Sequence, residues 1–204
     1  GTPFENDLHT LLDAATCCNN SRIVPPSLER PMWTNLGDQT EAALKVAAFK
    51  SDINEDELEL MYPRVHEIPF DARRKRMTTI HRDANREIAF VKGAPREVLQ
   101  LCSHVLISGR DEPLTESLKS EILATNDDYA RNALRVLALA QRPLQTKLGS
   151  YSVETVERDL TFLGLMAMMD PPRPEVEEAI RTFKKASIRI VMITGDYGLT
   201  AESL

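Results

Sequence analysis

The chain has 204 residues, enough to form one large hydrophobic core or a main domain with a smaller one beside it. Its 42% hydrophobic and 27% charged residues are typical of a globular protein. The net charge of −6 argues against a nucleic-acid-binding protein, which would usually carry a basic surface.

The apolar runs and the cysteines narrow the class further. The longest apolar run, residues 160–169, is much shorter than the roughly 20 residues that a membrane-spanning helix needs. Cys17, Cys18 and Cys102 are odd in number and lack Cys-x-x-Cys spacing, which favours a reducing compartment over a disulfide framework. We therefore expect an intracellular-facing domain.

Three helices are predicted in the first part of the chain. Apolar residues at helical spacing predict the first over residues 7–18, and a loop with three prolines follows. Asp38 stands three residues before Glu41 and opens an Ala/Leu-rich segment, which predicts a capped helix to about residue 49. Residues 54–62 predict a third, acidic helix.

From residue 65 the pattern changes mainly to strands. Strands are predicted over residues 65–70, 77–82, 87–92, 104–108, 135–143 and 160–169, with turns at 83–86 and 109–113. Helices are predicted over residues 95–102 and 114–134, and a polar loop with one helical turn over 145–157. The strands at 135–143 and 160–169 are almost continuously apolar, which is typical of the centre of a sheet.

The character of the chain changes again at residues 170–175, Asp-Pro-Pro-Arg-Pro-Glu, where adjacent prolines predict a hinge. A helix over 175–185, a strand from Ile188 to Ile193 and the start of another helix follow. A strand as apolar as this one is typical of a parallel sheet with both faces buried, but the sequence contains no second strand of this kind that could pair with it. We therefore expect residues 170–204 to begin a second domain, and the strand to permit self-association.

No common nucleotide-binding or catalytic motif is present, whether Walker, dinucleotide-binding, zinc-protease or serine-hydrolase. One stretch nevertheless suggests a ligand: the predicted strand at 87–92 ends in Lys92 and Gly93. A lysine there can face a phosphate, and a glycine lets a flat ring approach the backbone. A solvated lysine beside an ordinary turn glycine fits the same residues.

Four further residues allow two interpretations each. Phe70 can stack on a base or be buried in the core. Lys75, in the cationic run from Arg73 to Arg76, can attract phosphates or lie on a solvated face. Glu41 can complete a capping box or accept a hydrogen bond from a ligand amine. Arg135 can pair with a phosphate or with a carboxylate.

Taken in order, seven segments resemble the landmarks of the P-type cation-transporting ATPases, with the calcium-pump-like branch the most similar. These segments are CCNN, GDQTEAAL, PFDARRKRM, FVKGAPREV, ALRVLALA, MMDPPRPEV and IVMITGDYGLTA. The resemblance spans essentially the whole chain, and KGAP, DPPR and TGD are highly specific in combination.

The resemblance implies an α/β architecture in two parts. Residues 1–169 would form a nucleotide-binding domain with a mainly antiparallel sheet flanked by helices. Residues 170–204 would form the hinge and the start of the phosphorylation domain, of haloacid-dehalogenase-like Rossmannoid type. The chain would be a cytoplasmic domain of a multi-pass membrane protein, acting with the remaining phosphorylation, actuator and transmembrane domains.

The resemblance also implies a site for ATP, bound with Mg²⁺. The ATP pocket would be lined by Glu41, Phe70, Lys75, Lys92, Gly93, Arg135 and Leu137. Phe70 would stack on adenine and Glu41 would lie near its amine, while Lys75 and Arg135 would attend the phosphates. Asp170 and Arg173 would mark the hinge, and Thr194, Gly195 and Asp196 would contact the transferred phosphoryl group.

Two departures and two absent motifs limit this transfer. Ala72 stands where the family often has a phosphate-side arginine, so that Arg73 or Arg74 would have to compensate, and Tyr197 follows the TGD motif. The phosphorylated aspartate of DKTGTLT would precede residue 1, and the Mg²⁺-holding GDGxND would follow residue 204. We expect residues 1–204 alone to bind ATP without being phosphorylated, and to contain no metal site.

Two other classes of function remain as alternatives. A stand-alone ATP-binding regulatory module would end in a complete fold. A haloacid-dehalogenase-type phosphatase would need an aspartate motif on an N-terminal strand, whereas Asp7 lies in a helical pattern.

Overall fold

A computed structural model describes residues 2–83, 86–144, 150–169, 174–191 and 193. Its helices are α1 (Pro3–Cys17), α2 (Gln39–Lys50), α3 (Glu55–Met61), α4 (Pro95–Leu99), α5 (Glu116–Arg131), α6 (Val153–Val156) and α7 (Pro174–Lys185). Its strands are β1 (Arg22–Val24), β2 (Thr34–Leu36), β3 (Arg64–Asp71), β4 (Arg76–Asp83), β5 (Arg86–Gly93), β6 (Cys102–Ile107), β7 (Arg110–Pro113), β8 (Arg135–Leu144) and β9 (Leu160–Met168).

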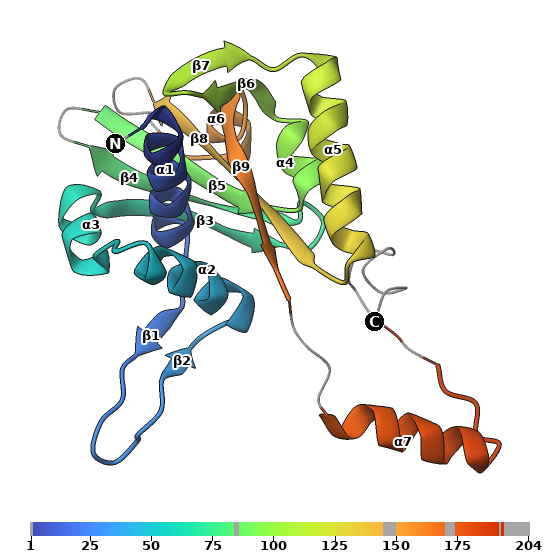
Figure 1. The fold of residues 1–204 in the computed structure, drawn as a ribbon. Helices are drawn as coiled ribbons and strands as arrows, with labels where there is room; N and C mark the ends of the chain where they lie inside the picture. The colour runs from blue at the N-terminus through green and yellow to red at the C-terminus, as the bar shows by residue number, and fades with distance from the viewer. Residues whose placement is uncertain (1, 84–85, 145–149, 170–173, 192, 194–204) are drawn as a thin grey trace.

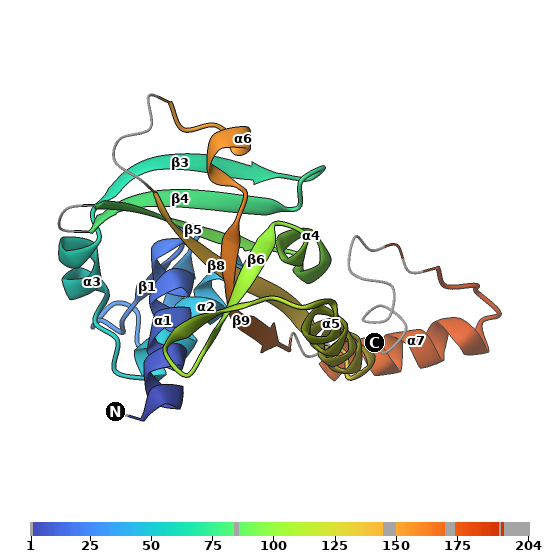
Figure 2. The same ribbon diagram turned by 90° about the horizontal axis from the view of Figure 1, so that it is seen from above.

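Seven of the strands form one twisted sheet in the order β3-β4-β5-β8-β9-β6-β7 (Figure 1). All neighbours are antiparallel except β6 and β9, which are parallel. Helices α1, α2 and α3 lie on one side of the sheet and α4 and α5 on the other (Figure 2). The predicted α/β class, with a mainly antiparallel sheet flanked by helices, is confirmed.

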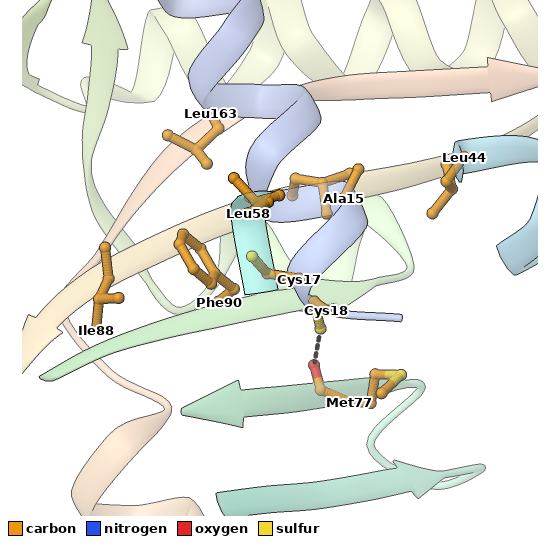
Figure 3. Packing of buried hydrophobic residues seen from close by; sticks show 11 residues of the cluster. Ala15, Cys17, Cys18, Leu44, Leu58, Met77, Ile88, Phe90 and Leu163 are labelled. Atoms are coloured by element: carbon orange, nitrogen blue, oxygen red, sulfur yellow. Dashed lines mark hydrogen bonds between the residues drawn. The ribbon is translucent and has the colours of Figure 1, made fainter. Parts of the chain in front are cut away.

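The central strands are apolar throughout because both of their faces are buried. On β5, Phe90 packs in the cluster under α1, α2 and α3, whereas its neighbour Val91 packs in the cluster under α4 and α5. Leu139 and Ala140 of β8 divide between the two clusters in the same way. Figure 3 shows the first cluster, where the Cys18 thiol also donates a hydrogen bond to the carbonyl of Met77. Successive side chains of these strands point to opposite faces of the sheet, and here both faces are buried. The alternating side chains therefore pack into two cores, one on each side of the sheet, rather than into one core and a solvent-exposed face.

Helix capping explains where several helices begin. Thr2 and Glu5 form a reciprocal capping box at α1, so that this helix starts four residues before the predicted position. The Asp38 carboxylate accepts the backbone N–H of Glu41 at α2, as the sequence pattern predicts. The three cysteines are free and buried, in agreement with the absence of a disulfide framework.

Several predicted elements differ from the structure. The proline-containing loop carries the two-stranded sheet β1-β2. Residues 110–113 form strand β7 rather than a turn, because Ser108 and Gly109 already reverse the chain with positive φ angles. Helix α4 ends at Leu99, so that Cys102 begins β6 instead of ending a helix.

The predicted strand from Ile188 to Ile193 is wrong for the residues that can be described there, 188–191 and 193, which have no strand structure. A strand needs hydrogen-bonding neighbours, and the order of the seven-stranded sheet includes none from this segment. Ile188, Ile190, Val191 and Ile193 are exposed. Helix α7 forms as predicted and lies apart from the sheet (Figure 1). Self-association through this segment remains a prediction.

Candidate functional site

A cleft of about 980 Å³ opens at one edge of the large sheet. Strand pairing brings three strand ends and the first part of β8 together here: Asp71 pairs with Arg76, Arg76 with Gly93, and Gly93 with Ala138. The start of α2, the start of α4 and the end of α5 complete the walls. The volume is at the upper end of the range usual for small-molecule sites.

All seven residues proposed from the sequence to line an ATP pocket line this cleft: Glu41, Phe70, Lys75, Lys92, Gly93, Arg135 and Leu137. They come from α2, β3, the β3–β4 turn, β5 and β8, and up to 96 positions separate them in the sequence, from Glu41 to Leu137.

Phe70 lies near the end of β3 with 63% of its surface exposed. Its interpretation as a core residue is therefore wrong. A phenylalanine so exposed on the wall of a cleft leaves apolar surface in water, which a flat ligand ring would cover. The ring is thus available for stacking.

Lys92 is buried, and its ammonium group donates to Glu41 Oε1 at 2.7 Å. The other oxygen, Glu41 Oε2, accepts the backbone N–H of Asn20 at 2.9 Å. Glu41 therefore reaches across the base of the cleft instead of completing a capping box, although Asp38 does cap the helix. The interpretation of Lys92 as a solvated lysine is likewise wrong.

Gly93 is required by close packing between strands. A Cβ at this position would lie 2.5 Å from Arg76 Cβ and 2.6 Å from the Lys75 carbonyl oxygen. Such distances would force β4 and β5 apart. The sequence suggested that this glycine leaves room for a ligand ring. The structure adds a second reason: β4 lies too close to allow any side chain at this position.

Lys75 occupies the tight turn between β3 and β4 with a φ of 52°. Its side chain is 58% exposed and pairs at 2.9 Å with Glu97 of α4. Asp71 fixes the turn: its carboxylate accepts the backbone N–H groups of Arg74 and Arg73, each at 2.9 Å. The hydrogen bond from Arg74, followed by the one from Arg73, lowers the pKa of this carboxyl group.

The cationic run from Arg73 to Arg76 is divided between two directions. Arg74 and Arg76 turn away from solvent to the buried Glu157, at 2.5 and 2.6 Å. Arg73 and Lys75 remain exposed. Of the two arginines expected to compensate for Ala72, Arg74 is thus engaged elsewhere and Arg73 is the one that faces water.

Arg135 and Leu137 enter the cleft from the first residues of β8. Arg135 donates to the Thr40 hydroxyl at 3.0 Å, which connects β8 with the start of α2. Leu137 packs against the core cluster below α1, so that it presents an apolar surface at the junction of cleft and core.

The carboxylates that line the cleft do not form a magnesium site. Glu41 binds Lys92, Glu97 binds Lys75, and Asp38 caps α2. Among the described residues, no group of three His, Cys, Asp or Glu side chains could hold a metal ion. The donor set present does not fit resident Mg²⁺.

Sequence reasoning missed part of the cleft wall. The further lining residues are Asn20, Asp38, Thr40, Ala72, Met77, Ala94, Pro95, Arg96, Glu97, Asn126, Ala130, Leu134 and Val136. Pro95 and Arg96 directly follow the Lys-Gly pair and could have been inferred from it. The α5 residues Asn126 and Ala130 carry no local signal. The proposed hinge residues Asp170 and Arg173, and the proposed phosphoryl contacts Thr194, Gly195 and Asp196, lie outside the described residues.

In the part of the chain that the structure describes, no helix is long and apolar enough to cross a bilayer. A second cavity, of about 450 Å³, lies between the end of α1 and α3 and includes Arg64 and His81. It contains none of the seven proposed residues.

Comparison with known proteins places the chain in a family. The sequence model described as "P-type ATPase, cytoplasmic domain N" matches residues 7–175. "Calcium-transporting ATPase 1" of Bacillus cereus is 42% identical over 197 residues, which cover 96% of this chain and 21% of the relative. "Calcium-transporting ATPase" of Bacillus subtilis is 39% identical over 199 residues, covering 97% and 22%. "Calcium-transporting ATPase 1" of Lactococcus lactis is 38% identical over 198 residues, covering 97% and 22%.

The chain thus spans about a fifth of the length of these relatives. The family model matches most of the chain. The match ends at residue 175, six residues after Met169, which directly follows β9. The resemblance found in the sequence motifs is confirmed: the chain belongs to the family of P-type ATPase cytoplasmic N domains.

Proposed function

We propose that this chain binds ATP in the cleft and delivers its γ-phosphate to an aspartate outside residues 1–204, within a P-type ATPase that transports cations across a membrane. Residues 1–169 form the nucleotide-binding domain in this proposal, and residues 170–204 the hinge and the start of the phosphorylation domain. The whole protein would be a multi-pass membrane protein with this domain in the cytoplasm. The relatives' names favour calcium as the cation.

The observation that carries the proposal is the composition of the cleft. An exposed aromatic ring, Phe70, shares the walls with Met77 and Leu137, and these apolar groups suit a purine. Cationic groups of Lys75 and Arg135 lie in the same cleft and suit the phosphates. Mg²⁺ would arrive with the nucleotide, since the cleft's own carboxylates are already paired.

The position of the cleft supports delivery of the phosphate to another domain. Met168, at the end of β9, pairs with Arg135, which lines the cleft. The chain therefore leaves the sheet at the same edge as the proposed nucleotide site. A hinge that follows β9 would therefore lie close to the bound nucleotide, and domain closure about this hinge would bring the nucleotide to the other domain.

Titration with ATP, followed by NMR, tests the proposal. We expect dissociation constants between about 10 µM and 1 mM, because the cleft has cationic side chains but no glycine-rich phosphate cradle. Shifts should centre on the residues around Phe70 and Lys92. Shifts scattered over other surfaces, or centred on the second cavity, would contradict the assignment.

Phe70→Ala provides the matching variant. The ring is exposed, so we expect the melting temperature to change by less than about 2 °C. The affinity for ATP should fall by about 5- to 100-fold, the range expected when one ring-stacking contact is lost. Phe49→Ala is the control, because Phe49 is 59% exposed and lies outside the cleft. Equal binding by the two variants would exclude stacking on Phe70.

A further inference from the structure

A buried carboxylate lies behind the wall of the cleft rather than in it. Glu157 follows α6, and its side chain has no exposed surface. Its Oε1 accepts hydrogen bonds from Arg74 Nη1 at 2.5 Å and from the Thr78 hydroxyl at 2.8 Å. Its Oε2 accepts one from Arg76 Nε at 2.6 Å. Glu157 thus binds two guanidinium groups that flank Lys75 in the sequence.

These two arginines hold the β3–β4 turn from both sides. Arg74 Nη2 also donates to the carbonyl of Pro69 at 2.7 Å, directly before Phe70. Arg76 Nη1 donates to the carbonyl of Arg74 at 3.0 Å. A continuous set of hydrogen bonds therefore runs from Glu157 through Arg74 to the backbone that carries Phe70.

Contacts from outside the turn add to the hydrogen bonds that Asp71 accepts within it. Lys75 has a left-handed backbone conformation, which is unfavourable for a residue with a side chain. Such a conformation persists where the surroundings fix it. Here the carbonyl of Lys75 accepts the backbone N–H of Ala94 at 3.0 Å, and the guanidinium groups on either side are fixed to Glu157.

We propose that Glu157 is a positioning residue for the nucleotide cleft: through Arg74 and Arg76 it fixes the turn that presents Phe70 and Lys75 to the ligand. Glu157 does not line the cleft and touches no ligand in this proposal. The inference rests on the proposed function for its binding readout, and on the turn's geometry alone for its structural readout.

Electrostatics and positioning predict opposite effects of neutralising Glu157. Glu157→Gln removes a negative charge and leaves two guanidinium groups less compensated, which by charge alone would strengthen binding of a polyphosphate. Loss of positioning would weaken binding of ATP. It would also weaken binding of adenosine, which has no phosphate and responds little to charge.

The experiment compares Glu157→Gln with Glu87→Gln in the full chain, below the melting temperature of both. Glu87 is a matched control because it is similarly buried and accepts a hydrogen bond from the Tyr151 hydroxyl at 2.6 Å, but lies at the opposite end of β5 from Gly93. We expect the dissociation constants of Glu157→Gln for ATP and for adenosine each to rise about tenfold. Those of Glu87→Gln should stay within about twofold of the wild type.

Amide hydrogen exchange provides a readout that does not depend on binding. In Glu157→Gln the amides of Arg73, Arg74 and Lys75 should exchange at least about tenfold faster, whereas Glu87→Gln should leave them unchanged. If the wild type bound no ATP, the proposed function would fail, and exchange in the turn would still decide the positioning inference. Wild-type exchange in a folded Glu157→Gln variant would overturn it.

Arg74→Gln covers the case in which Glu157→Gln does not fold. This substitution leaves Arg76 and Thr78 on Glu157 and removes the link to the Pro69 carbonyl. Charge loss alone would weaken ATP binding and leave adenosine binding intact. We expect both to weaken, and an unchanged dissociation constant for adenosine would reject the role of this link.

Discussion

Replacing Lys92 by Met tests whether this lysine holds the base of the cleft as well as facing a ligand. The Lys92 side chain is 6% exposed and its partner Glu41 is 15% exposed. Without the ammonium group, the Glu41 carboxylate keeps only the backbone N–H of Asn20 among its donors described here. Removing one partner of a buried ion pair costs about 3–5 kcal/mol of unfolding free energy.

The lower end of this range applies, because Glu41 retains some contact with water in the cleft. About 3 kcal/mol corresponds to a fall of about 6–12 °C in melting temperature for a chain of this size. Lys75→Met is the control: Lys75 also forms an ion pair, with Glu97, but is 58% exposed. Exposed pairs contribute at most about 1 kcal/mol.

Thermal unfolding followed by circular dichroism measures both variants and the double variant Glu41→Gln/Lys92→Met. Its melting temperature should lie above that of Lys92→Met, because the uncompensated carboxylate is gone. If Lys92→Met melted within about 2 °C of the wild type, the pair would not stabilise the fold. If the double variant were no more stable than Lys92→Met, the uncompensated Glu41 carboxylate would not be the cause of the loss.

Two further predictions concern the sheet. Gly93→Ala should lower the free energy of unfolding by about 1–3 kcal/mol, because its Cβ would lie 2.5 Å from Arg76 Cβ; an unchanged melting temperature would contradict this packing. His81 is buried, and burial lowers its pKa below the ordinary 6.5. As the pH decreases, His81 therefore takes up a proton in the unfolded chain before it does so in the folded chain. Its contribution to the free energy of unfolding is fully present above about pH 6.5 and decreases as the pH falls toward the folded-state pKa. We expect His81→Gln to flatten the decline in melting temperature between about pH 7 and pH 5, whereas His104→Gln, at an exposed position, should leave the decline as in the wild type; an unaltered decline in His81→Gln would show that other groups cause it.

Local sequence signals predicted most of the secondary structure. The apolar runs at 135–143 and 160–169 indicated central strands, and β8 and β9 are central in the sheet. The Asp38 cap and Pro95 at a first helical position predicted the starts of α2 and α4. These features depend on neighbours a few positions apart, so that one segment contains the whole signal.

Predictions failed where a segment's conformation depends on a distant partner. The segment from Ile188 has strand-like composition, but strand structure needs a second strand beside it. Phe70 carried equal signals for a core and for a surface position, because its exposure depends on what covers the end of β3. The periodic pattern of a strand gives its two faces, not the elements that lie over them.

The amino-acid sequence by itself determined which residues would gather at the cleft, through the resemblance of its motifs, and which segments would be strands and helices. Only the tertiary structure decided that Lys92 binds Glu41 and that β4 leaves no room for a side chain at Gly93. It also decided that Arg74 and Arg76 bind Glu157. The physical reason is that an ion pair or a close backbone approach is set by strand order and register. In this chain the partners Arg76 and Glu157 are 81 positions apart, a distance over which no local pattern carries information.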